Sequence, residues 1–461
     1  MMTKENVWLS YGPEDREQVH ALAERYKAFL STCKTERECT AYFIEQAERE
    51  GYRNLNDLMD SEISLQAGDK VYCNGMGKTV AFFQIGRRPL TEGMNILCAH
   101  IDSPRIDIKQ VPLYEDTELA YLDTHYYGGI KKYQWVTIPL ALHGVIAKKD
   151  GSLVRVNIGE KEEDPVLYIT DILIHLSAKQ MEKKASVVIE GEQLDILVGS
   201  EPVSGRDKEA VKAHILSLLK ESYDIEEDDF LSAELEIVPA GRARDCGLDR
   251  SMIAGYGHDD RVCAYPSFEA LLDQKEIPDR CSCCLLVDKE EIGSVGATGM
   301  ESRFFENAVA ELLALCGTDS GLAVRRALAR SCMLSSDVSA AYDPAFAEAF
   351  EKKNSAYFGK GLVLNKYTGA RGKSGSNDAN AEYIAKIRRI FDQAGVAFQT
   401  AEIGKVDFGG GGTIAYIAAL YGMEVIDSGV AVLSMHSPCE LISKADLYEA
   451  KKGYAAFLRD A

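Results

Sequence analysis

From residue 246 to the C-terminus, apolar runs alternate with amphipathic segments, and this alternation constrains the fold more than any other feature of the chain. The runs typical of strands are CCLLVD, SCMLSSD, VAFQTAE and MEVIDSG. The segments typical of helices are 262–273, 305–316, 378–394 and 412–421. Because this alternation places helices between parallel strands, we predict an α/β fold, a three-layer sandwich with a mainly parallel central sheet.

The first hundred residues carry signals of the same kinds. Residues 13–32 are expected to form a helix, because Pro13 suits a first turn and the apolar side chains share one face. A second helix is expected to begin after Thr35, which has the spacing of a capping box with Glu38, and to end near Gly51. Strands are predicted over 79–85 and 95–102.

The middle of the chain has a different pattern. It is rich in β-branched and aromatic runs such as RIDIKQV, YLDTHYY and SLVRVNI, with a hairpin signal at Asp150-Gly151 and one helical stretch over 206–221. We therefore predict that residues 106–245 form a mostly β domain inserted into the α/β domain, which consists of 1–105 and 246–461.

The net charge of the chain limits the kinds of molecule that it is expected to bind. The chain has 461 residues, with 52 Lys and Arg against 72 Asp and Glu, which gives a net charge of −20. A surface of this sign repels phosphate backbones and anionic lipid, so neither nucleic acid nor a membrane is expected as a partner. The N-terminus lacks the pattern of a signal peptide, and no apolar run reaches the roughly 18 residues of a membrane span. A cytoplasmic location is therefore predicted.

The twelve cysteines of the chain are expected to remain free thiols in that compartment. Cys281, Cys283 and Cys284 are close enough in sequence to suggest a zinc cluster. They open the apolar run CSCCLLV, however, and free cysteine behaves as a small hydrophobic residue. We interpret them as part of a buried strand and predict no structural zinc site.

Five short segments could carry chemistry, because each places histidine or carboxylate side chains beside an apolar run or a helix start. They are CAHIDSP at 98–104, GHDDR at 257–261, VDKEEIGSVGATG at 287–299, SCMLSSDVSAAYDP at 331–344 and AVLSMHSPCE at 431–440. In GHDDR, Asp259 or Asp260 could bridge two cations, and His258 is a possible ligand. Each segment alone also has an ordinary structural explanation. His100 and His436 could be core histidines, Asp259 a helix cap, and Glu291 and Asp337 turn residues.

Two of these segments have the pattern that metal-assisted hydrolysis needs. In CAHIDSP, His100 could bind a metal ion while Asp102 orients its ring. In VDKEEIG, one carboxylate of Glu290 and Glu291 could bind the ion while the other takes a proton from an attacking water. The glycines that follow lack the spacing of a phosphate-binding loop. Together the segments offer mixed nitrogen and oxygen ligands, which suit zinc, cobalt or manganese.

These segments, in this order, resemble the aspartyl aminopeptidase family, the M18 metallo-aminopeptidases, which includes the aminopeptidase I type. The resemblance covers nearly the whole chain and is closest to the bacterial branch, as seen in THYYGGIKKYQWVTIPLALHG, KYTGARGKSGSNDA and GKVDFGGGGTIA. It implies a metallo-exopeptidase that removes the N-terminal residue from peptides with a free N-terminus.

The resemblance also implies roles for individual residues. Two divalent metal ions per subunit, with zinc expected and cobalt or manganese possible, would activate a water for which Glu290 is the general base. His100 and Asp337 would hold one ion, Glu291 and His436 the other, and Asp259 would bridge them, while Asp102 orients His100. The residues implied for metal binding are His100, Asp259, Glu291, Asp337 and His436.

Two further residues follow from the resemblance. His175, in ILIHL, matches a histidine that reaches from the inserted domain into the active site of a neighbouring subunit, and Lys366 lies near a residue that reads the substrate side chain. The resemblance implies a homo-oligomer, a dodecamer, with the inserted domain making contacts between subunits.

Two other functions remain open from the sequence. The same ligands would serve a di-metal carboxypeptidase or an N-acyl amino acid deacylase, which act on a different part of the substrate. An inactive, cage-forming binding protein is the second alternative, although the complete ligand set and Glu290 argue against it.

Overall fold

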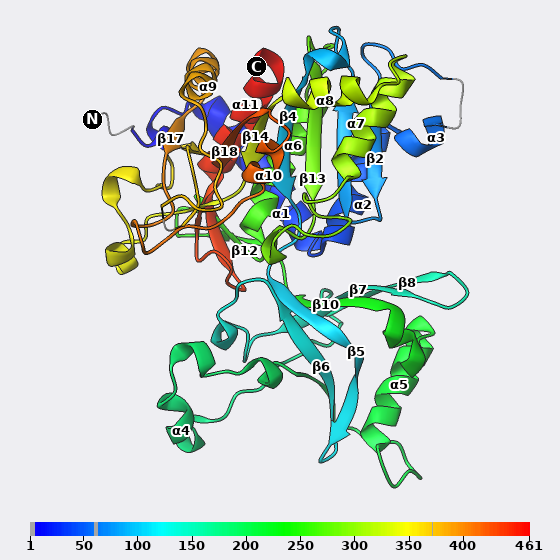
Figure 1. Cartoon of the computed structure of the whole chain (residues 1–461). Helices are drawn as coiled ribbons and strands as arrows, with labels where there is room; N and C mark the ends of the chain where they lie inside the picture. Colours follow the sequence, from blue (N-terminus) through cyan, green and yellow to red (C-terminus); the bar gives the residue numbers. More distant parts are fainter. Residues whose placement is uncertain (1–4, 60–62, 371) are drawn as a thin grey trace. The chain divides into compact units, whose positions relative to one another are not determined.

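The computed structural model describes residues 5–59, 63–370 and 372–461, which are grouped into two units (Figure 1). The first unit spans Met1–Asp102, Ala243–Met435 and Glu440–Ala461, and the second spans Ser103–Arg242 and His436–Cys439. The short segment His436–Cys439 thus belongs to the second unit, although the sequence had placed it in the α/β domain. Two parts of the sequence motifs lie outside the described residues. They are residues 1–4 of the N-terminus, which was compared with a signal peptide, and Arg371 of KYTGARGKSGSNDA.

A nine-stranded sheet forms the centre of the first unit, in the order β1-β2-β3-β13-β4-β14-β18-β16-β17. Its central strands β13, β4, β14 and β18 run parallel to one another, whereas β3 and β16 pair antiparallel with their neighbours towards the middle. The strands are β1 Arg53–Asn54, β2 Lys70–Gly75, β3 Thr79–Gln84, β13 Cys281–Val287, β4 Met94–His100, β14 Cys332–Ser336, β18 Glu424–Gly429, β16 Leu362–Asn365 and β17 Phe398–Thr400.

The side chains of this sheet enter two separate hydrophobic cores. In β13, Cys284 and Leu286 belong to one core, and Cys283 and Leu285 belong to the other, because successive residues of a strand point to opposite faces. The cysteines of CSCCLLV therefore lie in a buried strand, as predicted, and the opposite faces of Cys283 and Cys284 argue against a shared zinc ion.

Different helices supply the two cores. Side chains of α1 Pro13–Thr32, α2 Glu36–Arg49, α6 His258–Leu272, α9 Ala381–Gln393 and α11 Lys444–Asp460 enter the first core. Those of α3 Leu55–Met59, α7 Phe304–Leu315, α8 Gly321–Ala329 and α10 Ala415–Ala419 enter the second. The mixed α/β class is thereby confirmed, with α1 matching its predicted range and the Thr35–Glu38 capping box present at the start of α2.

A smaller five-stranded sheet completes the first unit and was not predicted as a sheet. Its order is β11-β12-β20-β19-β15, and its short strands come from distant parts of the chain. They are β11 Arg244–Cys246, β12 Met252–Gly255, β20 Glu440–Ser443, β19 Ala431–Leu433 and β15 Ser339–Ala340.

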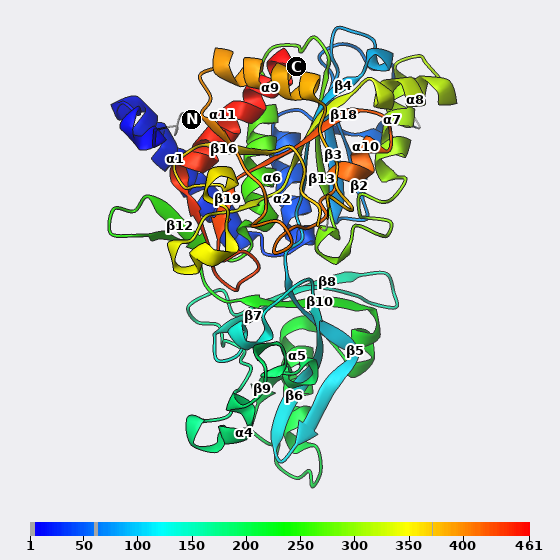
Figure 2. The same ribbon diagram turned by 60° about the vertical axis from the view of Figure 1, so that its left-hand side comes forward.

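The second unit contains an antiparallel six-stranded sheet in the order β8-β7-β10-β5-β6-β9, with helix α5 packed against β5, β6 and β9 (Figure 2). The elements are β5 Arg105–Asp116, β6 Leu119–Tyr127, β7 Leu140–Ala147, β8 Leu153–Ile158, β9 Ile196–Gly199, α5 Ala210–Tyr223 and β10 Ala233–Pro239. Asp150-Gly151 lies between the paired strands β7 and β8, so the hairpin prediction is confirmed. Among the described residues of either unit, no helix is long and apolar enough to cross a membrane.

Candidate metal centre

The sheet itself brings the predicted site residues together. Strand β4 lies between β13 and β14 and is parallel to both, so the carboxyl ends of the three strands meet at one edge. His100 is the last residue of β4, the Glu290–Glu291 turn follows β13, and Asp337 directly follows β14. Asp259 arrives at the same place from the first turn of α6.

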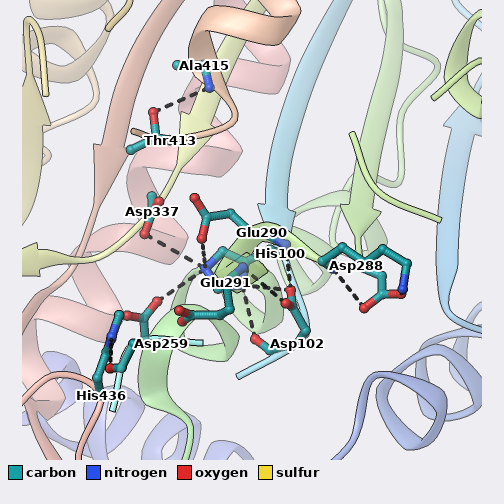
Figure 3. Close-up of polar contacts among 12 residues, drawn as sticks. His100, Asp102, Asp259, Asp288, Glu290, Glu291, Asp337, Thr413, Ala415 and His436 are labelled. Atoms are coloured by element: carbon teal, nitrogen blue, oxygen red, sulfur yellow. Dashed lines mark hydrogen bonds and ion pairs between the residues drawn. The ribbon is translucent and has the colours of Figure 1, made fainter. Parts of the chain in front are cut away.

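The carboxylates gather around the ring of His100 (Figure 3). Its Nε2 lies 3.2 Å from Oδ1 of Asp259, 3.9 Å from Oε2 of Glu290 and 3.9 Å from Oδ1 of Asp337. His100 is only 1% exposed. Among the residues that the structure describes, its buried Nε2 makes no hydrogen bond of regular geometry. A buried ring nitrogen that faces several carboxylate oxygens is the arrangement expected of a metal ligand.

Potential ligand atoms are close enough to share an ion in three combinations. His100, Glu290 and Asp337 form one, His100, Asp259 and Glu291 form the second, and Asp259, Asp260 and Asp337 form the third, with ligand atoms within 4.8 Å of one another in each. The nitrogen and oxygen donors fit zinc, and the overlapping combinations fit more than one position for a cation.

The electrostatics of the cluster favour a bound cation. Burial raises the pKa of Asp337 well above its usual value, and the carboxylates of Glu290 and Asp259 raise it further. Burial lowers the pKa of His100, but the adjacent carboxylates of Asp102 and Asp259 outweigh this effect and raise it well above the usual value. So many acidic groups in one buried place repel one another, and protons or a metal ion relieve that repulsion.

Asp102 contacts both sides of the site. Nδ1 of His100 lies 3.2 Å from Oδ1 of Asp102 and 3.0 Å from its carbonyl oxygen, a geometry that suits the orienting role predicted for Asp102. The same carboxylate also accepts the backbone N–H groups of Glu290 and Glu291, each at 3.2 Å. This second set of contacts was not foreseen from the sequence, because the partners lie far apart in the chain.

The GHDDR segment differs from its predicted form. Helix α6 begins at His258 rather than near 262, with Gly257 as its N-cap, and Asp259 and Asp260 lie inside its first turn with non-helical backbone angles. The N–H of Asp259 donates to Oε2 of Glu440 at 3.0 Å. Asp259 is thus not the helix cap. Asp260 groups with Asp259 and Asp337, and Glu440 is a neighbour of the site that was not selected from the sequence.

His258, which the motif also offers as a ligand, is a core residue instead. Its Nδ1 lies 2.9 Å from the hydroxyl of Tyr26, and the residue is fully buried. Burial lowers the pKa of His258 to about 3, so the ring is neutral at ordinary pH.

The structure gives the surroundings of three other predicted residues. His436 belongs to the second unit, where its Nδ1 is 2.9 Å from the carbonyl oxygen of Gly129. His175 lies in the exposed 3-10 turn Ile174–Leu176 of the same unit. Lys366, in the first unit, is ion-paired with Asp378. The first unit therefore brings together four of the five predicted ligands, namely His100, Asp259, Glu291 and Asp337.

Comparisons with known sequences identify close relatives. A profile of the family described as "Aminopeptidase I zinc metalloprotease (M18)" matches residues 29–458. A protein from Clostridium acetobutylicum described as "Probable M18 family aminopeptidase 1" is 61% identical over 456 residues, which cover 99% of this chain and 98% of the relative. A protein from Thermotoga maritima with the same description is 43% identical over 458 residues, which cover 99% of each chain.

Solved structures agree with the sequence matches. The crystal structure of an M18 family aminopeptidase from Thermotoga maritima has a TM-score of 0.95 at 42% identity and covers all of both chains. The crystal structure of aminopeptidase I from Clostridium acetobutylicum has a TM-score of 0.92 at 59% identity, covering 99% of this chain and 100% of the other.

An α/β unit with a buried histidine and several carboxylates gathered at the ends of its parallel strands is typical of metallohydrolases. Within this class, the full-length matches show that the chain belongs to the M18 family of aminopeptidases. It is a metal-dependent aminopeptidase of the branch that includes the bacterial relatives, and the family description names zinc, in agreement with the predicted cofactor.

Proposed function

We propose that the enzyme removes the N-terminal residue of peptides with two zinc ions per subunit and with Glu290 as the general base. His100 and Asp337 would hold one ion, Glu291 and His436 the other, and Asp259 would contact both. The observation that carries this proposal is the position of three carboxylates within 3.2–3.9 Å of the buried Nε2 of His100. Bound zinc would supply a Lewis acid that makes water acidic near neutral pH and polarises the scissile carbonyl.

The residues of the chain would divide the remaining work. Glu290 takes a proton from the attacking water and returns it to the leaving amine, which requires a carboxylate within reach of both groups. Asp102 fixes the ring of His100 and the backbone of the glutamate turn. His175 of a neighbouring subunit would donate a hydrogen bond to the developing oxyanion.

Substitution of Glu290 by Gln tests the role of the base. The amide keeps the shape of the side chain but cannot accept the proton, so we expect kcat to fall by about 10²–10⁴-fold. Zinc content per subunit, measured by mass spectrometry of the purified protein, should stay at the wild-type value. Near-wild-type turnover would exclude Glu290 as the base, and loss of zinc together with activity would make it a ligand.

The end of the substrate that is recognised can be tested with matched dipeptides. An aminopeptidase needs a free α-amino group, whereas a carboxypeptidase or a deacylase accepts or requires a blocked one. We expect the zinc-loaded enzyme to hydrolyse Leu-Gly or Asp-Ala and to leave their N-acetyl forms intact. Preferential cleavage of the acetylated peptides would overturn the proposal, and chelator-insensitive hydrolysis would contradict its metal dependence.

We also propose that the chain assembles into a homo-oligomer, a dodecamer, through its second unit. Support comes from exposed apolar side chains in that unit, including Leu173, Ile174, Leu176 and Met181. Lys366 remains a prediction for substrate binding. The three-layer arrangement of the first unit, the oligomerisation role of the second and the cytoplasmic location likewise remain predictions, the first supported by the two cores of the nine-stranded sheet.

A further inference from the structure

The turn that carries Glu290 and Glu291 begins with an unfavourable backbone conformation. Lys289, the residue just before the two glutamates, has a φ of 67°, which lies in the left-handed region that a non-glycine residue rarely adopts. A residue in this region persists only where its surroundings hold it in place. The position of both glutamate side chains depends on this residue, because it sets the direction in which the chain leaves β13.

Asp288 is hydrogen-bonded to the backbone where Lys289 begins. It follows the last residue of β13 and is 2% exposed. Its Oδ1 accepts the backbone N–H of Lys289 at 2.8 Å. The other oxygen, Oδ2, accepts the hydroxyl of Thr298 at 2.6 Å. Thr298 is itself 4% exposed, so the pair is shielded from water and its hydrogen bonds are not in competition with solvent.

The backbone closes the same loop around this pair. The N–H of Asp288 donates to the carbonyl oxygen of Thr298 at 3.2 Å. The N–H of Ser294 donates to the carbonyl oxygen of Lys289 at 2.7 Å. Gly299 allows the closure, because a Cβ at this position would lie 2.2 Å from the carbonyl oxygen of Ser294. Residues 288 and 298, the two ends of this loop, are therefore hydrogen-bonded to each other through their backbones and through the side chains of Asp288 and Thr298.

We propose that Asp288 and Thr298 form a positioning pair that, together with Asp102, fixes the glutamate turn. Asp102 accepts the N–H groups of Glu290 and Glu291, and the Asp288–Thr298 pair holds the residue before them. Two buried carboxylates therefore hold the backbone N–H groups of three consecutive residues, Lys289, Glu290 and Glu291. This inference rests on the proposed function, because it assigns importance to the exact placement of Glu290 and Glu291.

The isosteric substitution Thr298→Val tests the pair, since it removes the hydroxyl and keeps the volume. We expect kcat to fall by about 10-fold or more, with KM within about twofold, and zinc affinity in a chelator titration to weaken by about 10–100-fold. Thr298→Ser restores the hydroxyl and should recover most of both quantities.

Thr79→Val is the matched control for stability. Thr79 is fully buried and donates its hydroxyl to the carbonyl oxygen of Leu286 in β13 at 2.8 Å, so it loses a comparable hydrogen bond on the same strand without contact to the turn. We expect a similar loss in Tm but kcat and zinc affinity close to those of the wild type.

The outcomes separate this inference from the function on which it rests. If Thr298→Val matches Thr298→Ser and Thr79→Val in kcat and zinc affinity, the positioning role is wrong, whatever Glu290→Gln shows. If Glu290→Gln retains full turnover while Thr298→Val weakens zinc binding and Thr298→Ser restores it, the pair still positions the turn and the assignment of the base is wrong.

Discussion

At the scale of single residues, the carboxylates of the site differ in the atoms that they contact. Asp102 accepts hydrogen bonds from Glu290 and Glu291 and lies beside Nδ1 of His100, so it links two strand ends that meet only in the folded sheet. Asp259 and Asp337 instead present oxygens to Nε2 of the same ring. The orienting and metal-binding roles proposed for these carboxylates therefore differ in geometry rather than in residue type.

We predict that Asp102→Ala weakens zinc binding, whereas Glu290→Gln leaves it intact. Removal of the Asp102 carboxylate frees the His100 ring to rotate and leaves the N–H groups of the glutamate turn without their acceptor. Partners of this kind contribute about 10–100-fold to metal affinity or activity. Competition with a zinc chelator measures the effect for both variants side by side. Equal zinc affinity in Asp102→Ala and wild type would contradict the orienting role.

The sequence indicated which residues could take part in metal chemistry. It indicated much less about the hydrogen bonds that position those residues. His100 with Asp102, and Glu290 with Glu291, could be selected because histidine and paired carboxylates beside apolar runs suit metal chemistry. The bond from Glu291 N–H to Asp102 joins positions 189 residues apart, and no local pattern encodes such a contact. Glu440 was missed for the same reason.

At the scale of elements, a buried carboxylate joins helix α11 to the loop before β16. Asp446, in the first turn of α11, is fully buried and accepts the N–H groups of Gly359 at 2.8 Å and Gly361 at 2.7 Å. Burial raises its pKa to about 7, although these hydrogen bonds act in the opposite direction. The loop and the helix are therefore held together by a group that changes its charge near neutral pH.

This pKa predicts a pH-dependent stability. Between about pH 4, where Asp ionises in an unfolded chain, and about pH 7, where Asp446 ionises in the folded one, the folded state binds more protons. The contribution of this group to stability is therefore complete at low pH and is lost as the pH rises through about 7, with an amplitude on the order of 4 kcal/mol.

Asp446→Asn imitates the protonated side chain and should not follow this pH dependence. We expect Tm of the variant relative to wild type to rise by a few degrees between pH 5 and pH 8 in thermal unfolding. Asp150→Asn, at an exposed hairpin position where hydrogen bonds with Ser152 lower the pKa, should show a constant difference over the same range. A constant difference for Asp446→Asn as well would show that its ionisation is not linked to folding.

Elements with strong local signals were predicted well. Helices α1 and α2 follow from Pro13, the Thr35–Glu38 capping box and a regular apolar face. Helices α8 and α11 were not among the predicted segments, and Gly453 weakens the helical pattern of α11. The structure gives a reason for that glycine, because a Cβ there would lie 2.9 Å from Cδ2 of Leu362 in β16. Close packing between elements thus overrides local propensity.

At the scale of the whole molecule, the second unit presents an apolar segment that its own fold does not cover. Ile174 and Leu176, on either side of His175, are each 69% exposed. Exposed apolar side chains that lie together in sequence are unfavourable in water and typical of interfaces. The position of His175 between them fits its proposed role across a subunit boundary.

We predict that Leu176→Asp reduces the size of the assembly, because a charge buried in an interface without a partner is strongly unfavourable. Light scattering coupled to size-exclusion chromatography measures the mass. Leu153→Asp is the matched control, since Leu153 is 64% exposed on β8 of the same unit and lies outside the proposed interface. An unchanged mass for Leu176→Asp would argue against this segment as the interface.

His175→Ala separates assembly from catalysis. The substitution removes the imidazole and leaves Ile174 and Leu176 in place, so we expect the mass of the assembly to be unchanged. Loss of one oxyanion donor typically lowers kcat by about 10²–10³-fold. Normal peptide hydrolysis by an intact assembly of this variant would show that His175 has no role in the reaction.

The buried cysteines of the sheet have a consequence for how the protein reacts with its surroundings. Burial raises the pKa of the Cys283 and Cys284 thiols, so they remain protonated and are poor targets for peroxide or alkylating reagents. Among the described residues, Cys439 is the cysteine that is exposed. A maleimide dye should therefore label this position first, three residues after His436, and its fluorescence would report directly on the segment that carries the predicted fifth ligand.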